Sequence, residues 1–489
     1  MYPFSSYMTF TRRVSPWDRR HARRRATEME ARMMTIPWET LKEELGDKLS
    51  FGESVRRSHA KDESYHPEHL PDAVAYPEET ADVVALARFS HAHGVPLVAY
   101  GAGSGLEGQV IPVRGGISVD FSRMNRVLEI RPDDFLVCVE PGVTRQQLND
   151  ALRPYGLMFP VDPGANASLG GMAATNASGT TAVRYGPMKA NVRKLEVVLA
   201  DGRVIEVGTL AAKSSSGYNL VELFVGSEGT LGIFTKLWLR VYGVPEATLA
   251  ASAEFATVRE AVDAVCMLIG SGLQLTRCEL VTKPYIEIIN RQFDTSYTPA
   301  PTLFLELSGS QAAVQADMGT VDEILRDAGA ARVSVVMDER ERQKLWHARH
   351  NAAYALMRTY PGLSHLSTDV CVPMSKLPEA VDVAETWIER LGIRGGIVGH
   401  VGDGNFHVSL MVNPSDPDDL GRAYELSHHL VEYALSVGGT CTGEHGVGLG
   451  KMKYQKQEHG EALALMQAVK RLFDPADMLN PGKLVDGIA

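Results

Sequence analysis

From residue 72 onward, the spacing of hydrophobic and polar positions predicts short strands joined by helices. The first expected elements are a strand over 73–76, a helix that begins near Pro77 and ends at Gly94, and a strand over 96–100. The helix is predicted from apolar residues that recur at helical spacing: Val83, Val84, Ala87 and Phe89. This alternation favours mixed α/β architecture in the first half of the chain.

The pattern changes after Pro245, where longer amphipathic runs begin. Their periodicity predicts helices over 260–269, 311–327 and 344–358, interleaved with strands such as 302–307. The change at this proline indicates a second domain with its own core.

Composition places the chain among ordinary globular proteins. It has 489 residues, of which 44% are hydrophobic, and this length predicts two or three domains. A net charge of −11 argues against nucleic acid as a partner. The five cysteines are scattered and never spaced CxxC, so neither a disulfide framework nor a cysteine-held cluster is expected. No apolar run approaches the ~18 residues of a spanning helix, which predicts a soluble or peripheral protein.

The first 35 residues differ from the rest of the chain. They hold eight arginines and only three acidic residues. A transit peptide has this composition, and a basic disordered leader or a start codon placed too early stays equally open. The expected location is therefore cytoplasmic, with peripheral attachment to the inner membrane left open, or mitochondrial if the leader is a transit peptide.

Three glycine-rich stretches suggest a bound nucleotide. Gly103, Gly105 and Gly108 match GxGxxG, but the sequence Gln109-Val110-Ile111-Pro112 follows where a Rossmann fold needs a helix, so that fold is excluded. Residues 163–179 and 225–233 also carry few side chains beyond Cβ, which lets backbone N–H groups approach a diphosphate. Simple tight turns are the alternative for each stretch taken alone.

A histidine-rich segment predicts a metal site. If Asp403-Gly404 is a two-residue hairpin turn, His400 lies directly opposite His407, close enough for both rings to bind one cation. Glu444, between Gly443 and His445, would supply a carboxylate as the third ligand of an open site. Zinc and manganese both suit this donor set, and a zinc hydrolase is one interpretation of it. The alternative is a glycine-rich turn with unrelated surface histidines.

Taken together, these motifs make the chain resemble FAD-linked D-2-hydroxyacid dehydrogenases of the vanillyl-alcohol-oxidase-like flavoproteins, and among them the cytochrome-type D-lactate dehydrogenases. The resemblance spans residues 71–484. It rests on GAGSGLEG (101–108), VDPGANASLGGMAATNASGT (161–180), RYG (184–186), FVGSEGTLGI (224–233), TDVCVP (368–373), GHVGDGNFH (399–407), GEHGVG (443–448) and FDPADMLNPGK (473–483).

The resemblance implies an α+β fold. A two-subdomain FAD-binding domain is expected over 36–245, an α+β cap domain over 246–445, and a C-terminal return to the FAD domain over 446–489. No histidine occurs in the glycine stretches, so the implied FAD is non-covalent. Residues carried over as FAD contacts are Gly101, Gly103, Ser104, Gly105, Gln109, Pro163, Gly164, Gly170, Ala173, Asn176, Ser178, Gly179, Gly232, Ile233 and Asn480.

The implied chemistry is oxidation of D-lactate to pyruvate by hydride transfer to FAD. His400, His407 and Glu444 match the family's metal ligands, and His445 matches its general base. Arg349, on the apolar face of a predicted helix, is our choice to hold the substrate carboxylate. Electrons would pass to a cytochrome, a quinone or another carrier. Whether the protein forms a homodimer is left open at this point.

Two positions bear on the substrate. Ser367 stands where relatives that act on diacids carry a lysine, and Ala353 stands where a hydroxyl residue would help hold a second carboxylate. A monocarboxylate is therefore expected. Glycolate or another D-2-hydroxy acid such as 2-hydroxyglutarate is the alternative substrate.

Overall fold

The computed structural model describes residues 36–485, so the basic leader over 1–35 lies outside the described residues. The chain divides into two compact units, residues 1–49 and 50–489. The described part of the first unit contains helix α2 (Trp38–Leu45) and a 3₁₀ turn (Gly46–Lys48), and Lys42 Nζ donates a hydrogen bond to the Leu49 carbonyl. Everything below concerns the second unit.

The second unit begins with a small parallel sheet. Strand β4 (Ile117–Asp120) lies between β2 (Ala73–Ala75) and β3 (Leu97–Tyr100), and helix α4 (Thr80–His93) connects β2 to β3. A capping box begins α4, and Gly94, with φ of 63°, ends it. The predicted strand, helix and strand are thus confirmed.

The chain returns to this sheet near its C-terminus. The Leu97 N–H donates to the Met478 carbonyl, and the Asn480 N–H donates to the Leu97 carbonyl. Leu479 thereby forms a parallel bridge beside β3. The predicted C-terminal return to the first domain is confirmed.

A second, antiparallel sheet follows and packs against short helices. Its strand order is β5-β6-β10-β8-β9. The strands are β5 (Val127–Arg131), β6 (Leu136–Val139), β8 (Val192–Val198), β9 (Val204–Gly208) and β10 (Ile233–Arg240). Part of the second glycine-rich stretch forms helix α6 (Leu169–Thr175) rather than an open loop. A Cβ at Gly170 would lie 2.5 Å from the Pro141 Cβ, so glycine is needed for this close packing.

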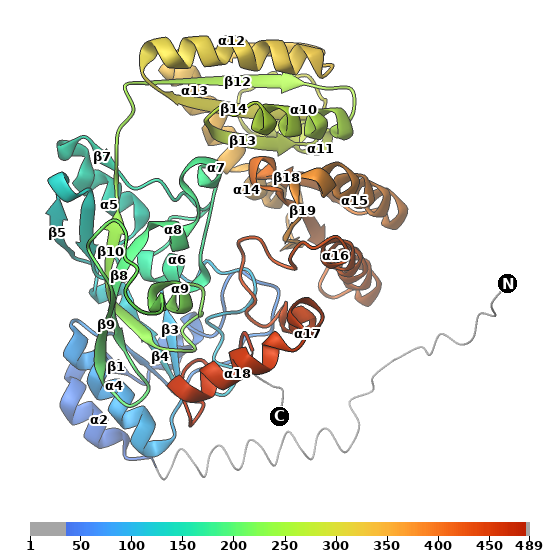
Figure 1. The fold of residues 1–489 in the computed structure, drawn as a ribbon. Helices are drawn as coiled ribbons and strands as arrows, with labels where there is room; N and C mark the ends of the chain where they lie inside the picture. The colour runs from blue at the N-terminus through green and yellow to red at the C-terminus, as the bar shows by residue number, and fades with distance from the viewer. Residues whose placement is uncertain (1–35, 486–489) are drawn as a thin grey trace. The chain divides into compact units, whose positions relative to one another are not determined.

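The second half of the chain builds a larger antiparallel sheet, drawn in the upper part of Figure 1. Its order is β15-β12-β14-β13-β18-β19-β16, and β17 (Val370–Cys371) pairs with β19. The other strands are β12 (Ala247–Glu254), β13 (Leu275–Val281), β14 (Thr302–Gly309), β15 (Arg332–Val336), β16 (Ser364–Ser367), β18 (Gly395–Gly399) and β19 (Asn405–Val412).

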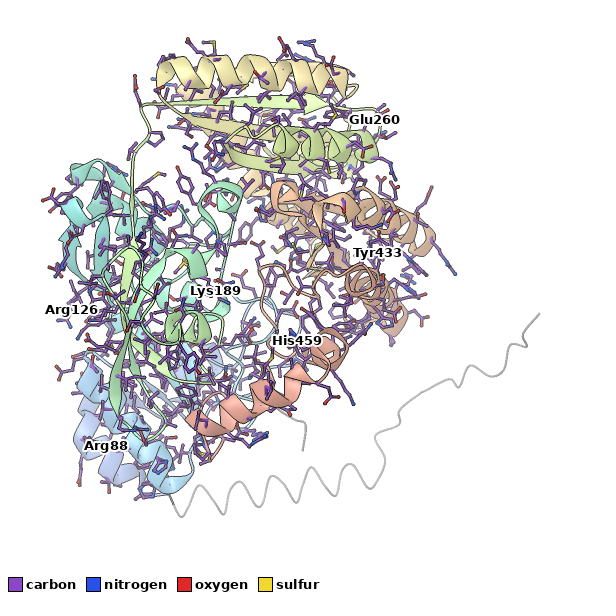
Figure 2. The ribbon with its side chains drawn as sticks, viewed as in Figure 1. Arg88, Arg126, Lys189, Glu260, Tyr433 and His459 are labelled. Atoms are coloured by element: carbon purple, nitrogen blue, oxygen red, sulfur yellow. The ribbon has the colours of Figure 1, made fainter. Side chains whose placement is uncertain are left out.

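Four helices cover one face of this sheet and enclose the larger hydrophobic core. They are α10 (Val258–Gly270), α12 (Gln311–Asp327), α15 (Leu377–Leu391) and α16 (Pro417–Ser436). Figure 2 shows Glu260 in the first turn of α10 and Tyr433 on α16, on this helical side of the sheet. The predicted helices over 260–269 and 311–327 and the strand over 302–307 are confirmed.

The prediction of one continuous helix over 344–358 is wrong, because the structure has two helices in this region. Helix α13 (Glu339–His350) ends and α14 (Ala352–Thr359) begins at Asn351. The Asn351 side chain donates a hydrogen bond to the His347 carbonyl, and such local side-chain bonds compete with a regular helix. With α11 (Lys283–Gln292), these helices form a second core on the other face of the sheet.

Strand alternation gives the sheet one apolar face and one partly polar face. On β13, Cys278 and Leu280 belong to the larger core, so Arg277 and Glu279 point the opposite way. On β19, Phe406 and Val408 face that core and His407 faces the other side. The polar side chains of neighbouring strands are therefore brought onto one surface.

A buried histidine–aspartate pair under the first sheet makes stability depend on pH. His59 Nε2 lies 2.8 Å from Asp120 Oδ2, and His59 Nδ1 lies 2.8 Å from the Val55 carbonyl. Burial opposes charge on the ring, but the hydrogen bonds with Asp120 and Val55 outweigh it and raise the pKa of His59. Such a group stabilises the fold fully below its unfolded pKa, about 6.5, and less as pH rises through its folded value.

We expect Asp120→Asn to lower the free energy of unfolding of the holoprotein by about 1–3 kcal/mol at pH 6, and by less at pH 9. Urea denaturation at the two pH values measures this. Asp201→Asn, which removes a carboxylate paired with the exposed Arg203, is the control and should show no such trend. An Asp120→Asn effect of equal size at both pH values would contradict the assignment.

Candidate active site

The predicted histidine hairpin exists, but with a different register. Strands β18 and β19 pair antiparallel, and Val398, not His400, lies opposite His407. The turn is a 3₁₀ turn (Val401–Asp403) followed by Gly404 at φ 78°, so Asp403 does not have the positive φ of a two-residue turn. The register differs from the prediction by two residues. Because side chains alternate with period two, His400 still lies on the same face as His407.

The two histidines meet Glu444 as predicted. Glu444 Oε1 lies 3.1 Å from His400 Nε2 and 3.0 Å from His407 Nε2. One ligand atom from each of the three residues lies within 4.8 Å of the other two. Glu444 Oε2 accepts a hydrogen bond from Ser178 Oγ at 2.7 Å, so a residue expected at the flavin also supports this carboxylate.

The hydrogen bonds of His407 indicate that a cation fits between these groups. His407 Nδ1 lies 3.0 Å from the Thr368 carbonyl, which can only accept, so this nitrogen carries the proton. In the neutral ring the lone pair of Nε2 then points at the Glu444 carboxylate. Because both atoms are hydrogen-bond acceptors, this arrangement needs a proton or a metal between them. Two imidazole nitrogens and one carboxylate are a donor set suited to zinc or manganese.

His400 is surrounded by negative charge. Its Nδ1 lies 2.7 Å from Glu279 Oε1, while Nε2 faces Glu444. Burial alone would lower the pKa of His400, but the two carboxylates raise it well above its usual value. The site therefore favours positive charge, as a divalent-metal site must.

Asp369 fixes the segment that carries Glu444 and His445. Its side chain is fully buried, and Oδ2 accepts hydrogen bonds from the backbone N–H groups of both residues at 2.9 Å and from Thr442 Oγ1 at 2.7 Å. Asn405 Nδ2 donates to the other oxygen at 2.7 Å. Asp369, His407 and His445 also cluster closely enough for a metal, but the oxygens of Asp369 already accept these four bonds. The sequence motif containing Asp369 was recognised without this role.

The His445 ring lies beside that of His407. The two rings stack, with centroids 4.8 Å apart and planes 7° apart, and the buried Nδ1 of His445 has no hydrogen-bond partner in the part of the chain that the structure describes. Burial lowers the pKa of His445 to about 4, against the opposing effect of Asp369. The ring is thus neutral near pH 7, and Nδ1 can accept a proton. Its carbonyl accepts a hydrogen bond from Gln109 Nε2 at 2.6 Å.

Arg349 lies in the last turn of α13 and is buried. Its Nη2 donates to Glu279 Oε2, whereas its buried Nε has no hydrogen-bond partner within residues 36–485. Nε–H can therefore still donate to a carboxylate. Glu279 was not predicted, because a single acid within a strand carries no motif. His350 lines the cavity beside Arg349.

A cavity of about 290 Å³ brings these groups together with the glycine-rich stretches, and a smaller one of about 80 Å³ shares Gly101, Gln109 and Ser168 with it. Ser168 Oγ is buried and has no hydrogen-bond partner among the residues that the structure describes, as expected at a ligand site. Predicted FAD residues that line the larger cavity are Gly101, Gly103, Ser104, Gly105, Gln109, Pro163, Gly164 and Ser178. Gly170, Gly232, Ile233 and Asn480 line the smaller one.

Three predicted FAD residues line neither cavity. Ala173 is fully buried within α6, and Asn176, at φ 53°, ends that helix. A Cβ at Gly179 would lie 2.3 Å from the Asp162 carbonyl oxygen. These residues pack the wall of the cavity rather than its surface.

Comparison with known proteins identifies the family. Residues 71–208 match the FAD binding domain, and residues 244–484 match the C-terminal domain of FAD linked oxidases. A probable mitochondrial D-lactate dehydrogenase of Danio rerio is 45% identical over 442 residues, covering 90% of this chain and 89% of the relative. The chain belongs to the FAD-linked D-2-hydroxyacid dehydrogenases. It is an FAD-dependent oxidoreductase, and the interpretation of the site as a zinc hydrolase is set aside.

Other relatives of this dehydrogenase have different names. A mitochondrial D-lactate dehydrogenase [cytochrome] of Arabidopsis thaliana is 41% identical over 392 residues, covering 80% of this chain and 69% of the relative. The glycolate oxidase subunit GlcD of Escherichia coli K12 is 32% identical over 406 residues, covering 82% and 81%.

Solved structures show the fold of this dehydrogenase. p-Cresol methylhydroxylase has a TM-score of 0.77 at 17% identity and covers 94% of this chain and 96% of its own. 4-Ethylphenol oxidase from Gulosibacter chungangensis has a TM-score of 0.77 at 19% identity and covers 93% and 97%. The predicted vanillyl-alcohol-oxidase-type fold is confirmed. Within residues 36–485, no helix combines the length and hydropathy needed to cross a bilayer.

If His400, His407 and Glu444 hold a divalent metal, we expect Glu444→Ala to purify without metal while retaining FAD, because the substitution removes the oxygen shared by both histidines. Metal analysis and the flavin absorbance of the purified protein measure the two occupancies. Glu389→Ala on α15, an exposed site, is the control and should keep both. Full metal occupancy in Glu444→Ala would remove this residue as a ligand.

Proposed function

We propose that this dehydrogenase oxidises D-lactate to pyruvate. The observation that carries the proposal is the shared cavity, in which the His400–His407–Glu444 donor set, the neutral His445 and the Arg349 guanidinium lie beside the glycine-rich stretches. Relatives named as D-lactate dehydrogenases support the choice of substrate.

In this mechanism each side chain has a separate task. His400, His407 and Glu444 would hold a divalent metal that supplies a Lewis acid for the substrate hydroxyl, and non-covalent FAD would supply the hydride acceptor. The free Nε edge of Arg349 binds the substrate carboxylate and sets the orientation of the α-carbon. His445 Nδ1 accepts the hydroxyl proton, which its neutral state permits. The hydroxyl proton and the α-hydride thus leave to different acceptors.

The lining of the cavity favours a monocarboxylate. Ser367 and Ala353 both lie on it, as expected for residues that select the substrate. Among the described lining residues, Arg349 is the single arginine, and there is no lysine to hold a second carboxylate. Glycolate is the alternative supported by the GlcD relative, whereas 2-hydroxyglutarate would need another cation.

Relatives also guide the proposals for electron acceptor and location. The name D-lactate dehydrogenase [cytochrome] favours a cytochrome among the external carriers considered, which include quinones and soluble proteins. The mitochondrial relatives support the mitochondrial alternative over a cytoplasmic location. A homodimer stays a proposal.

Anaerobic mixing of the holoenzyme with D-lactate tests the substrate, its chirality and the metal together. We expect D-lactate, but not L-lactate, to bleach the flavin absorbance, and chelation to abolish the bleaching until metal is restored. D-2-Hydroxyglutarate should bleach at least tenfold less efficiently at equal concentration. Bleaching by glycolate or 2-hydroxyglutarate in preference to D-lactate would overturn the substrate assignment.

We expect His445→Ala to retain flavin but to slow its reduction by about 10²–10⁴-fold, because the hydroxyl proton loses its acceptor. Stopped-flow absorbance at saturating D-lactate measures the rate. His428→Ala, an exposed histidine on α16, should reduce at the wild-type rate. Near wild-type reduction in His445→Ala would exclude His445 as the base.

A further inference from the structure

Glu279 connects two functional groups without reaching the cavity. It lies on β13, its side chain is 0% exposed, and it is absent from the residues that line the cavity. Its Oε1 lies 2.7 Å from His400 Nδ1, and its Oε2 accepts from Arg349 Nη2. One carboxylate thus bonds both a metal-binding histidine and the residue assigned to the substrate carboxylate.

The burial of Glu279 requires an explanation. Moving a carboxylate out of water costs several kcal/mol even after the protein relaxes, and an apolar replacement of similar volume is often no less stable. The neighbouring Cys278 and Leu280 show that this strand supplies ordinary core residues on its other face. A simple salt bridge to Arg349 would account for one oxygen of Glu279, but not for the hydrogen bond that the other makes with His400.

The contact with His400 determines which ring nitrogen can bind metal. A carboxylate accepts the Nδ1 proton and leaves the Nε2 lone pair directed at Glu444 and His407, an arrangement that orients the ring and increases its basicity. The contact with Arg349 engages Nη2 and leaves Nε without a partner among the described residues. Both effects come from the same carboxylate, so the positions of the two groups depend on each other.

We propose that Glu279 is a positioning residue that couples metal binding to substrate binding. The predicted effect on substrate binding rests on the proposed function. The predicted effect on metal binding rests on the His400 contact alone. Because Glu279 touches neither cavity nor substrate, its loss acts through His400 and Arg349.

Glu279→Gln tests the coupling, because an amide has one acceptor oxygen and an NH₂ group that cannot accept. The side chain can then satisfy His400 or Arg349, but not both. We expect metal binding to the FAD-loaded, metal-free protein to weaken about 10–100-fold. We also expect the D-lactate concentration that half-reduces the flavin, at saturating metal, to rise about tenfold, with a smaller change in the maximal rate. Manganese titration followed by electron paramagnetic resonance measures the first quantity without turnover.

The control is Glu306→Gln, a buried carboxylate on β14 that pairs with Arg277 and Arg342. It should change neither the manganese affinity nor the half-reducing concentration by more than about twofold. If Glu279→Gln keeps wild-type affinity for both, the proposal is overturned, whatever happens to its melting temperature.

The double variant Glu279→Gln/Arg349→Met separates positioning from general damage. Removing both members of a buried ion pair avoids an uncompensated charge, and the oxygen of the introduced amide is then free to accept from His400. We expect manganese affinity to recover toward the wild-type value, while D-lactate reduction stays impaired. Affinity as weak as in Glu279→Gln would contradict the coupling. If no D-2-hydroxy acid reduces the flavin of the wild-type protein, the proposed function fails. The manganese titrations then still decide whether Glu279 positions His400 for metal binding.

Discussion

The active site depends on the burial of one carboxylate, that of Asp369. A buried acceptor of this kind is costly unless donors surround it, and Asp369 obtains four from Thr442, Asn405 and the backbone N–H groups of Glu444 and His445. Three of these donors lie within four consecutive residues, so the Thr442–His445 segment cannot move away without leaving the carboxylate unsatisfied. Glu444 and His445, the proposed metal ligand and the proposed base, are therefore placed by the same constraint.

A second set of bonds fixes this segment against the FAD-binding half. Glu228, itself in the left-handed region at φ 51°, accepts hydrogen bonds from the backbone N–H groups of Val447 and Gly448 at 2.6 and 2.9 Å. Asn480 Nδ2 donates to the Gln109 and Glu228 carbonyls. His445 is thus attached to the cap sheet through Asp369 and to the glycine-rich loops through Gln109. This double attachment sets the distance between His445, the proposed base, and the expected flavin position.

Much of the fold could be predicted because the signals were local. Gly94 ends α4, and periodic apolar residues define α10 and α12, with no information needed from distant parts of the chain. The His400–His407–Glu444 cluster was predicted from a wrong register, and the prediction survived because the error was an even number of residues. The fold of the FAD-binding half was predicted from the resemblance of its motifs to those of a known family.

The remaining features depend on tertiary contacts that sequence spacing does not reveal. Glu279 and Asp369 are single acids within short apolar stretches, and their partners lie 70–121 and 36–76 residues away. At the break between α13 and α14, the Asn351 side chain donates a hydrogen bond to the His347 carbonyl, a local contact that spacing alone does not predict. Ala173, Asn176 and Gly179 belong to the motif, yet they pack behind the cavity surface.

The pairing of β18 with β19 restricts where this enzyme can change in length. Inserting or deleting one residue within β19, between Asn405 and His407, would move the His407 ring onto the face occupied by Phe406 and Val408, where an imidazole would replace core packing. One residue added to or removed from the turn that follows His400 leaves the strand pairing intact. Length variation between the two histidines should therefore fall in the turn and spare the strand.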